Sequence, residues 1–178
     1  MLSALVDPSP AAAAVAAEAG VPLYQSLEEL LARDRPDGLI LATPNPLHVP
    51  QALQCIDAKL PILLEKPIAT TVAEGAQLVQ RVKQSGARVL IGHHRAHSPI
   101  MAKAKAVIAE GRLGRLVSVM GSALFCKPDD YFTAAPWRTV QGGGPILINL
   151  IHEIHNLRML CGEIVEVQAM SSNAVRGF

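Results

Sequence analysis

The sequence GLILATPNPLHVPQALQCIDAKLPILLEKPIATTVAEGAQLVQRVKQSGARVLIG, residues 38–92, decides the fold because short apolar runs alternate in it with segments of helical spacing. Strands that alternate with helices of this length form parallel sheets with right-handed crossovers. We therefore predict an α/β fold whose parallel sheet is covered by helices on both faces. The predicted strands are Gly38–Thr43, Pro61–Leu64 and Arg88–Gly92, and the predicted helices are Pro50–Lys59 and Thr71–Ser85.

The alternation extends to both sides of this stretch. Ser26, with Glu29 three residues later, forms a capping box that begins a helix ending near Pro36, and Ser98-Pro99 begins a helix that runs to Gly111. Further upstream, the sequence predicts a strand over Leu2–Val6, a helix over Ala11–Ala19 closed by Gly20, and a weak strand at Leu23–Tyr24.

The pattern changes after Gly114. An imperfectly alternating strand, an irregular polar segment, an apolar helix and a last strand indicate the start of a second, α+β domain. We therefore divide the chain into residues 1–114 and 115–178. The predicted elements of the second part are a strand over Leu116–Phe125, a helix over Pro145–Cys161 and a strand over Ile164–Met170.

Composition excludes several classes of protein. Half of the 178 residues are hydrophobic, 17% are charged and the formal net charge is +1, so the chain is expected to be globular rather than disordered. No run of basic residues exceeds two, so nucleic acid is not an expected partner. The apolar stretches are too short to span a bilayer, which predicts a cytoplasmic protein with no membrane partner. The three cysteines, which form no C-x-x-C pair, are predicted to be free core thiols: Cys55, Cys126 and Cys161.

Polar residues follow two of the predicted strands. Thr43-Pro44-Asn45 lies between a strand and a helix N-terminus, which suits an anion such as a dinucleotide but also suits an ordinary βα loop. Glu65-Lys66-Pro67 follows the next strand and adds a carboxylate and an ammonium at the same sheet edge. Adjacent residues on a strand point in opposite directions, so we predict that Glu65 and Lys66 contact different partners.

These motifs occur in an order that resembles a known family. Ala42–His48, Leu64–Ile68 and Ile91–Arg95 are followed by Trp137-Arg138, and Gly142-Gly143-Gly144 then precedes His152. The set resembles the glucose-fructose oxidoreductase, inositol dehydrogenase and MocA family. The resemblance implies an oxidoreductase that uses NAD or NADP to transfer a hydride to or from a sugar, a cyclitol or a related cyclic hydroxy substrate.

The resemblance also implies roles for individual residues. Lys66 matches the catalytic lysine, and His152 is its expected acid/base partner, because the aspartate that commonly stands four residues before this histidine is Ile148 here. Asp7 would contact the adenosine ribose, which favours NAD, or else is only a turn residue before proline. Arg95 lies on the substrate side or forms a domain-interface ion pair. The cofactor-binding set is Asp7, Thr43, Pro44, Asn45, His48, Glu65, Lys66, Trp137 and Arg138, and the substrate set is Arg95, Asn149 and His155.

No metal site is predicted. His152 and His155 are spaced i, i+3, whereas two helical zinc ligands with a general-base glutamate need the i, i+4 spacing. His93, His94 and His97 follow a strand at the expected cofactor edge and are interpreted as site-lining or surface residues.

None of the 13 glycines fits the G-x-G-x-x-G turn with which such a dinucleotide-binding unit opens. We therefore expect an incomplete Rossmann-type parallel sheet, without its first strand and glycine-rich turn, followed by the start of an α+β substrate domain. Leu2–Val6 and Gly38–Thr43 would then either pair directly or lack their central neighbour. The alternative to an active oxidoreductase is a truncated, inactive fragment that is at most a weak nucleotide-binding or subunit-associating module. An exposed partial sheet would favour association into a homo-oligomer.

Overall fold

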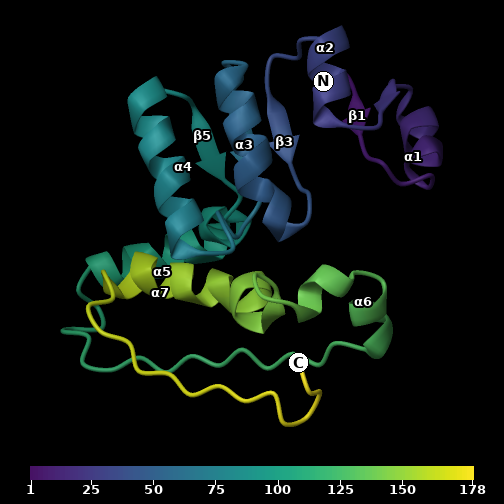
Figure 1. Cartoon of the computed structure of the whole chain (residues 1–178). Coiled ribbons are helices and arrows are strands. Elements are labelled where there is room, and N and C mark those ends of the chain that lie inside the picture. Colours follow the sequence, from purple (N-terminus) through teal and green to yellow (C-terminus); the bar gives the residue numbers. More distant parts are fainter.

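The computed structural model describes all 178 residues, and its first half follows the predicted alternation of strands and helices (Figure 1). The strands are β1 (Leu5–Val6), β2 (Leu23–Tyr24), β3 (Leu39–Leu41), β4 (Ile62–Leu64) and β5 (Val89–Ile91). The α-helices are α1 (Ala12–Ala19), α2 (Leu27–Arg33), α3 (His48–Asp57), α4 (Val72–Ser85), α5 (Pro99–Ala109), α6 (Asp129–Thr133) and α7 (Ile151–Cys161). Three 3₁₀ turns, η1 (Asn45–Leu47), η2 (His94–His97) and η3 (Pro136–Thr139), and one π-helical turn, η4 (Ile146–Leu150), complete the chain.

Capping residues set several helix boundaries. Thr71 and Glu74 form a complete capping box at the start of α4, and Gly86 ends that helix with a φ of 67°. Ser26 accepts a hydrogen bond from the backbone of Glu29 at the start of α2, but the Glu29 carboxylate bonds the backbone N–H of Gln25 instead of closing the box. The sequence therefore predicted these ends correctly, except for half of one capping box.

The strands form two separate parallel sheets. One contains β1 and β2, and the other has the order β3-β4-β5. β1 and β3 are not hydrogen-bonded to each other, so direct pairing of these two predicted strands does not occur.

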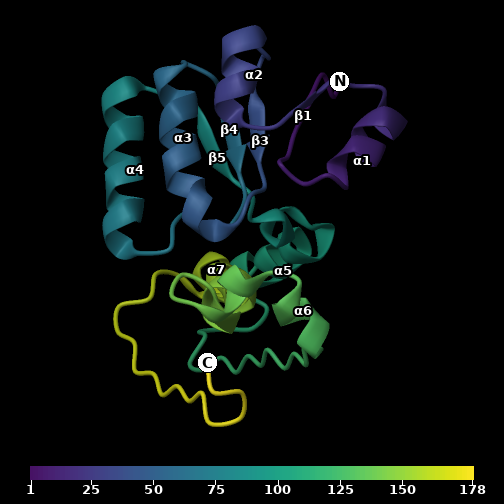
Figure 2. The same cartoon turned by 45° about the vertical axis from the view of Figure 1, so that its right-hand side comes forward.

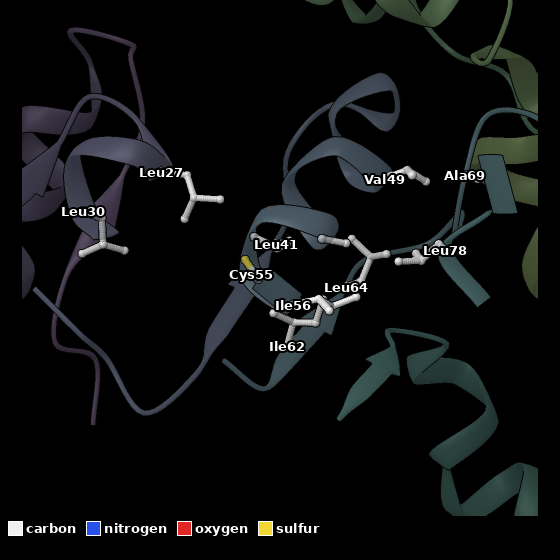
Figure 3. Close-up of a cluster of buried hydrophobic side chains, with 11 residues drawn as sticks. Leu27, Leu30, Leu41, Val49, Cys55, Ile56, Ile62, Leu64, Ala69 and Leu78 are labelled. Atoms are coloured by element: carbon white, nitrogen blue, oxygen red, sulfur yellow. The ribbon is translucent and has the colours of Figure 1, made fainter. Parts of the chain in front are cut away.

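Helices cover only one face of the three-stranded sheet. Figure 3 shows the side chains of Leu41, Cys55 and Leu64 gathered in the core between this sheet and its helices. On the opposite face, the pairing register places Ile40, Leu63 and Leu90 side by side, with exposed fractions of 71%, 37% and 69%. We call these three residues the open row. The prediction that helices cover both faces is wrong at this row, because no helix packs on it.

The segments after Gly114 differ from the prediction. Leu116–Phe125 and Ile164–Met170 form no strands, because neither finds a hydrogen-bonded partner, and their side chains are largely exposed. The predicted helix over Pro145–Cys161 is present as η4 and α7, and α7 packs against α5 and η2. Burial raises the pKa of the Cys55 thiol to about 11, but Cys126 and Cys161 are exposed, so their assignment to the core is wrong.

None of the helices is both long enough and apolar enough to span a lipid bilayer.

Candidate active site

The site lies where the carboxyl ends of β3, β4 and β5 face α7 (Figure 2). Because the strands are parallel and in register, the loops that follow them meet at one edge of the sheet. Backbone hydrogen bonds from Glu65 to Leu41 (2.8 Å) and from Gly92 to Leu64 (2.7 Å) extend the two ladders to this edge. The predicted motif residues are therefore fixed at the point where the sheet ends.

Lys66 is held by the element opposite the sheet edge. Its Nζ donates a hydrogen bond of 2.9 Å to the backbone carbonyl of Ile148 in η4. Ile148 occupies the position at which the resemblance leads one to expect an aspartate, so a neutral backbone carbonyl accepts the lysine hydrogen bond here. Burial lowers the pKa of Lys66, and Arg95 and Lys127 lower it further, while Glu65 opposes the shift. The lysine is thus better suited to exchange a proton than a fully solvated one.

Glu65 and Lys66 form no ion pair, which confirms that their side chains serve different contacts. One Glu65 oxygen accepts from the Lys66 backbone N–H at 3.2 Å. The other lies against Gly92, where an added Cβ would come within 2.7 Å of Oε1. Sequence reasoning gave no role to Gly92, although a glycine at a strand end is a signal of close approach.

His48 is a buried clamp between two loops. His48 is only 1% exposed, and its ring nitrogens face the carbonyl oxygens of Pro67 (2.7 Å) and Thr43 (2.8 Å). The ring is thus engaged with the two loops, and a contact between His48 and a cofactor stays a prediction. The residue connects the loop after β3 to the turn after β4.

The loop after β3 is also tied to other parts of the protein. Thr43 Oγ1 donates to Gln51 Oε1 at 2.7 Å, and the buried Asn45 Nδ2 donates to the carbonyl of Gly142 at 2.9 Å. Gly142 has a φ of 89°, and a Cβ there would lie 2.7 Å from the Cβ of Thr70. Pro44 is the residue that precedes η1. The side chains of Thr43 and Asn45 therefore hold the loop in place, and a contact of either residue with a cofactor stays a prediction.

His152 projects from α7 into the interface below the sheet edge. It is 5% exposed, and its ring packs edge-on against His94 with centroids 4.9 Å apart. Its Nδ1 is buried without a hydrogen-bond partner. Burial lowers the pKa of His152 to about 4, aided by Arg95, Lys66 and His94 and opposed by Glu153. The ring is therefore neutral at neutral pH.

A second histidine pair joins η2 to α7. The rings of His93 and His155 stack with centroids 4.2 Å apart and planes 8° apart. Burial lowers the pKa of His93, and His155 lowers it further. Arg95 forms an ion pair with Glu153, so the interface ion pair, one of the two roles expected for this arginine, is present. The His, Cys, Asp and Glu side chains include no group of three or more arranged to hold a metal ion.

A cavity of about 670 Å³ opens beside Ile148, the residue whose carbonyl accepts the Lys66 hydrogen bond. Ile148 and Asn149 from η4 line it, together with Arg138 from η3 and residues of the C-terminal segment. Trp137, beside Arg138, is half-buried and is not part of the lining. The cavity therefore collects two of the predicted residues next to the carbonyl that holds Lys66.

Asp7 lies apart from this group, on the separate sheet of β1 and β2. Its Oδ1 accepts a hydrogen bond of 2.7 Å from the Ser9 backbone, so the turn role is present. The ribose contact stays a prediction.

Two family models match the chain. One, described as an oxidoreductase family with an NAD-binding Rossmann fold, matches residues 1–93. The other, described as the GFO/IDH/MocA C-terminal domain, matches residues 101–178.

The curated relatives include dehydrogenases and a reductase. The 1,5-anhydro-D-fructose reductase of Ensifer adhaerens is 31% identical over 171 residues, which cover 93% of this chain and 50% of that protein. The levoglucosan dehydrogenase of Pseudarthrobacter phenanthrenivorans is 32% identical over 135 residues, which cover 74% of this chain and 35% of that protein. The chain thus spans half the length of these relatives or less.

Solved structures share the fold. The WlbA dehydrogenase from Bordetella pertussis, in complex with NADH and UDP-GlcNAcA, matches with a TM-score of 0.85 and 30% identity, over 91% of this chain and 50% of that one. The myo-inositol 2-dehydrogenase from Lactobacillus plantarum matches with a TM-score of 0.77 and 18% identity, over 91% of this chain and 49% of that one.

Proposed function

The chain belongs to the glucose-fructose oxidoreductase, inositol dehydrogenase and MocA family, and from this premise we propose that it transfers a hydride between a nicotinamide cofactor and a hydroxyl-bearing carbon of a sugar or cyclitol. The observation that carries the proposal is the position of Lys66. A partly buried ammonium with a lowered pKa lies at the carboxyl edge of the sheet, beside Glu65 and opposite His152.

The sheet edge fits the nicotinamide side of such a cofactor. Gly92 leaves the gap in which the Glu65 carboxylate lies, and a side chain at this position would fill it. Glu65 would bind the nicotinamide ribose, and the backbone of Thr43 and Asn45 would border the ring. Asp7 retains one carboxylate oxygen that no hydrogen bond uses, which supports a ribose contact and NAD rather than NADP. A bound nicotinamide supplies the hydride acceptor in oxidation.

Lys66 moves the proton in this proposal. In oxidation its neutral amine takes the hydroxyl proton as the hydride leaves the carbon, and in reduction the ammonium returns the proton to the carbonyl oxygen. The Ile148 carbonyl holds Nζ in place for this transfer. His152, which is neutral, would accept a hydrogen bond from the substrate hydroxyl and orient it. Of the predicted acid/base pair, the lysine is thus the proton carrier and the histidine the orienting group.

The proposed substrate class rests on the substrates for which the relatives are named. Several are named for a sugar or cyclitol, among them levoglucosan dehydrogenase and inositol 2-dehydrogenase. Arg95 would act here mainly by fixing η2 to α7 through Glu153, and His155 by stacking on His93. Asn149, which lines the cavity, would contact the substrate directly.

A second candidate function is a subunit-associating or weak nucleotide-binding module without catalysis. The observation that favours it is the open row together with the unpaired edges of β1 and β3. Both features expose surface that binding to another chain would cover.

The test is a titration of the 178-residue protein with NADH and NADPH, followed by fluorescence and thermal melting, and then a hydride-transfer assay with sugars and cyclitols. We expect saturable NADH binding, a raised melting temperature and turnover. Lys66→Ala should abolish turnover while the affinity for NADH stays within about twofold, whereas Lys105→Ala, on the exposed side of α5, should behave as the parent. Failure to bind either cofactor would overturn the proposal in favour of the associating module, and turnover by Lys66→Ala would remove the lysine from the mechanism.

A further inference from the structure

Residues 142–148, which lead from the glycine turn into η4, are held at both ends by side chains of the first half. At one end Asn45 Nδ2 donates to the carbonyl of Gly142 at 2.9 Å, and at the other Lys66 Nζ donates to the carbonyl of Ile148 at 2.9 Å. Asn45 follows β3 and Lys66 follows β4, the neighbouring strand of the same sheet. Two donors from adjacent strands therefore hold one short piece of backbone, which we call the anchored segment.

The first of these bonds is buried. Asn45 is only 5% exposed, and Gly142 is buried as well. A buried carbonyl that loses its donor has no water to replace it, so such a bond is costly to break. The side chain of Asn45 therefore joins the loop after β3 firmly to the second half.

The glycine turn leaves this end of the anchored segment little room to shift. A Cβ at Gly142 would lie 2.7 Å from the Cβ of Thr70, and a Cβ at Gly143 would lie 2.6 Å from the carbonyl oxygen of Trp137. The turn is thus pressed against the segment before α4 on one side and against η3 on the other. Its position is fixed by this packing together with the Asn45 hydrogen bond.

The position of the turn determines where the lysine is held. From Gly144 to Leu150 the backbone is helical, so a displacement of the turn is carried to Ile148 and is not absorbed by a flexible loop. Lys66 Nζ has no other hydrogen bond and no ion pair within the chain, so the Ile148 carbonyl alone fixes it. The charged and titratable groups near this lysine are Glu65, Arg95, Lys127, His93 and His152.

We propose that Asn45 is a positioning residue: by holding Gly142 it sets the position of the Ile148 carbonyl, and thereby the position from which Lys66 exchanges its proton. The inference rests on the proposed function, because it adds a residue to that same site. A neutral amine that donates one N–H to the carbonyl keeps its lone pair for the substrate hydroxyl. The Asn45 side chain thus serves proton transfer, and the cofactor contact expected of this residue is left to its backbone.

The first test needs neither cofactor nor substrate. The pKa of Lys66 is measured by NMR from the ¹³Cε shift of lysine-labelled protein, with the signal assigned by its loss in Lys66→Arg. Burial is the main cause of the lowered pKa of Lys66. Asn45→Ala should raise this pKa toward the ordinary value of lysine, because release of the anchored segment admits water to Nζ. The signal of Lys105, on the exposed side of α5, should titrate alike in both proteins.

Gln51→Ala is the matched control. It removes the partner of Thr43 Oγ1 and so loosens the same loop, but it leaves the bond from Asn45 to Gly142 intact. The pKa of Lys66 should therefore stay at the parent value in this variant. Thermal melting checks that each protein is folded, and Asn45→Ser, whose side chain is one atom shorter, replaces Asn45→Ala if that variant does not fold. An unchanged pKa of Lys66 in the folded Asn45 variant would overturn the inference.

The second test uses kinetics. Asn45→Ala should lower kcat about tenfold or more, because the proton carrier is misplaced, while the affinity for NADH stays within about twofold. Gly142→Ala moves the same turn from the other side, since its methyl group would meet Thr70. The double variant should therefore lose no more kcat than Gly142→Ala alone. Full additivity of the two losses would contradict a shared action on Lys66.

The two tests separate this inference from the proposed function. A raised pKa of Lys66 in Asn45→Ala, in a protein whose parent binds no NADH and has no turnover, would support the anchor and contradict the oxidoreductase. Turnover by the parent, with a loss of NADH affinity in Asn45→Ala but a parent pKa of Lys66, would support the oxidoreductase and overturn the inference. In that case the Asn45 side chain would contact the cofactor.

Discussion

The half of the molecule built on β3, β4 and β5 and the half that follows Gly114 bury their apolar segments very differently. Leu64, at the centre of the first half, is completely buried between the sheet and its helices, whereas Leu124 in the second half is 92% exposed. In the first half, each strand is joined to the next by a helix that packs on the same sheet face, so hydrogen bonding and burial occur together. The segments of the second half have apolar side chains but neither a pairing partner nor a covering element. Apolar composition alone therefore does not make a strand.

A matched pair of substitutions measures this difference most directly. Leu64→Ala should lower the free energy of unfolding by about 2–5 kcal/mol, because it removes a buried side chain and leaves a cavity in close-packed surroundings. Leu124→Ala, the same change at an exposed position, should alter it by less than about 0.5 kcal/mol. Urea unfolding followed by circular dichroism gives both values. Equal losses would show that the second half is packed as tightly as the first.

How far the sequence predicts the structure follows the same division. Local signals were sufficient for the helix ends at Gly20, Thr71 and Gly86, where capping needs only neighbouring residues. The edge at which Lys66 lies also followed from the sequence, since parallel strands bring their carboxyl ends together. The absence of strands after Gly114 could not be predicted from the sequence, because strand pairing depends on residues distant in the chain.

Contacts between distant residues were likewise beyond sequence reasoning. Nothing in the local sequence shows that His48 turns inward to two carbonyl oxygens, or that the Ile148 backbone accepts the lysine hydrogen bond. The close approach of Glu65 to Gly92 had a local signal, a glycine at a strand end, which indicates proximity but not the partner. The cavity beside Ile148 assembles residues from four separate segments, so no motif could reveal it.

The clamp at His48 provides a sharper test within the first half. His48→Ala leaves the carbonyl groups of Thr43 and Pro67 without their partner in a buried position, and we expect a loss of about 1–3 kcal/mol in the free energy of unfolding. It should also raise KM for the cofactor, because the two loops lose their connection. His97→Ala, at an exposed histidine of η2, should change neither quantity measurably. Denaturant unfolding and steady-state kinetics on both variants decide the question, and a stable His48→Ala protein with parent KM would show that the clamp is dispensable.

The interface between the two halves, where His152 is buried, should make the free energy of unfolding depend on pH. His152 binds its proton less tightly in the folded protein, where its pKa is about 4, than in the unfolded chain, where histidine titrates near 6.5. The unfolded state therefore takes up more protons as the pH falls through this window, so the free energy of unfolding should decrease between pH 6.5 and pH 4. His93, whose pKa is also lowered by burial and by His155, acts in the same direction.

Melting temperatures at pH 7, 6 and 5 measure this dependence. The groups that face His152 from the packed elements are Arg95, His94, Lys66, Glu153 and the edge-on ring of His93, and Glu153 favours the protonated ring. His152→Gln should flatten the pH dependence, whereas His97→Gln should leave the parent slope. A steep slope that persists in His152→Gln would assign the effect to the other buried groups of this interface.

A substitution in the open row should have the smallest effect on the free energy of unfolding. It tests the comparison with a residue that belongs to a strand but is exposed. Leu90 belongs to a paired strand, like Leu64, but is 69% exposed, like the segments of the second half. If burial, and not membership of a strand, sets the energetic difference between the halves, Leu90→Thr should change the free energy of unfolding by no more than about 0.5 kcal/mol. The same substitution should reduce self-association in sedimentation velocity, because it makes an exposed apolar row more polar. A free energy of unfolding that rises with protein concentration in the parent but not in the variant would show instead that the row is covered by a second copy, and that the first half is completed by association.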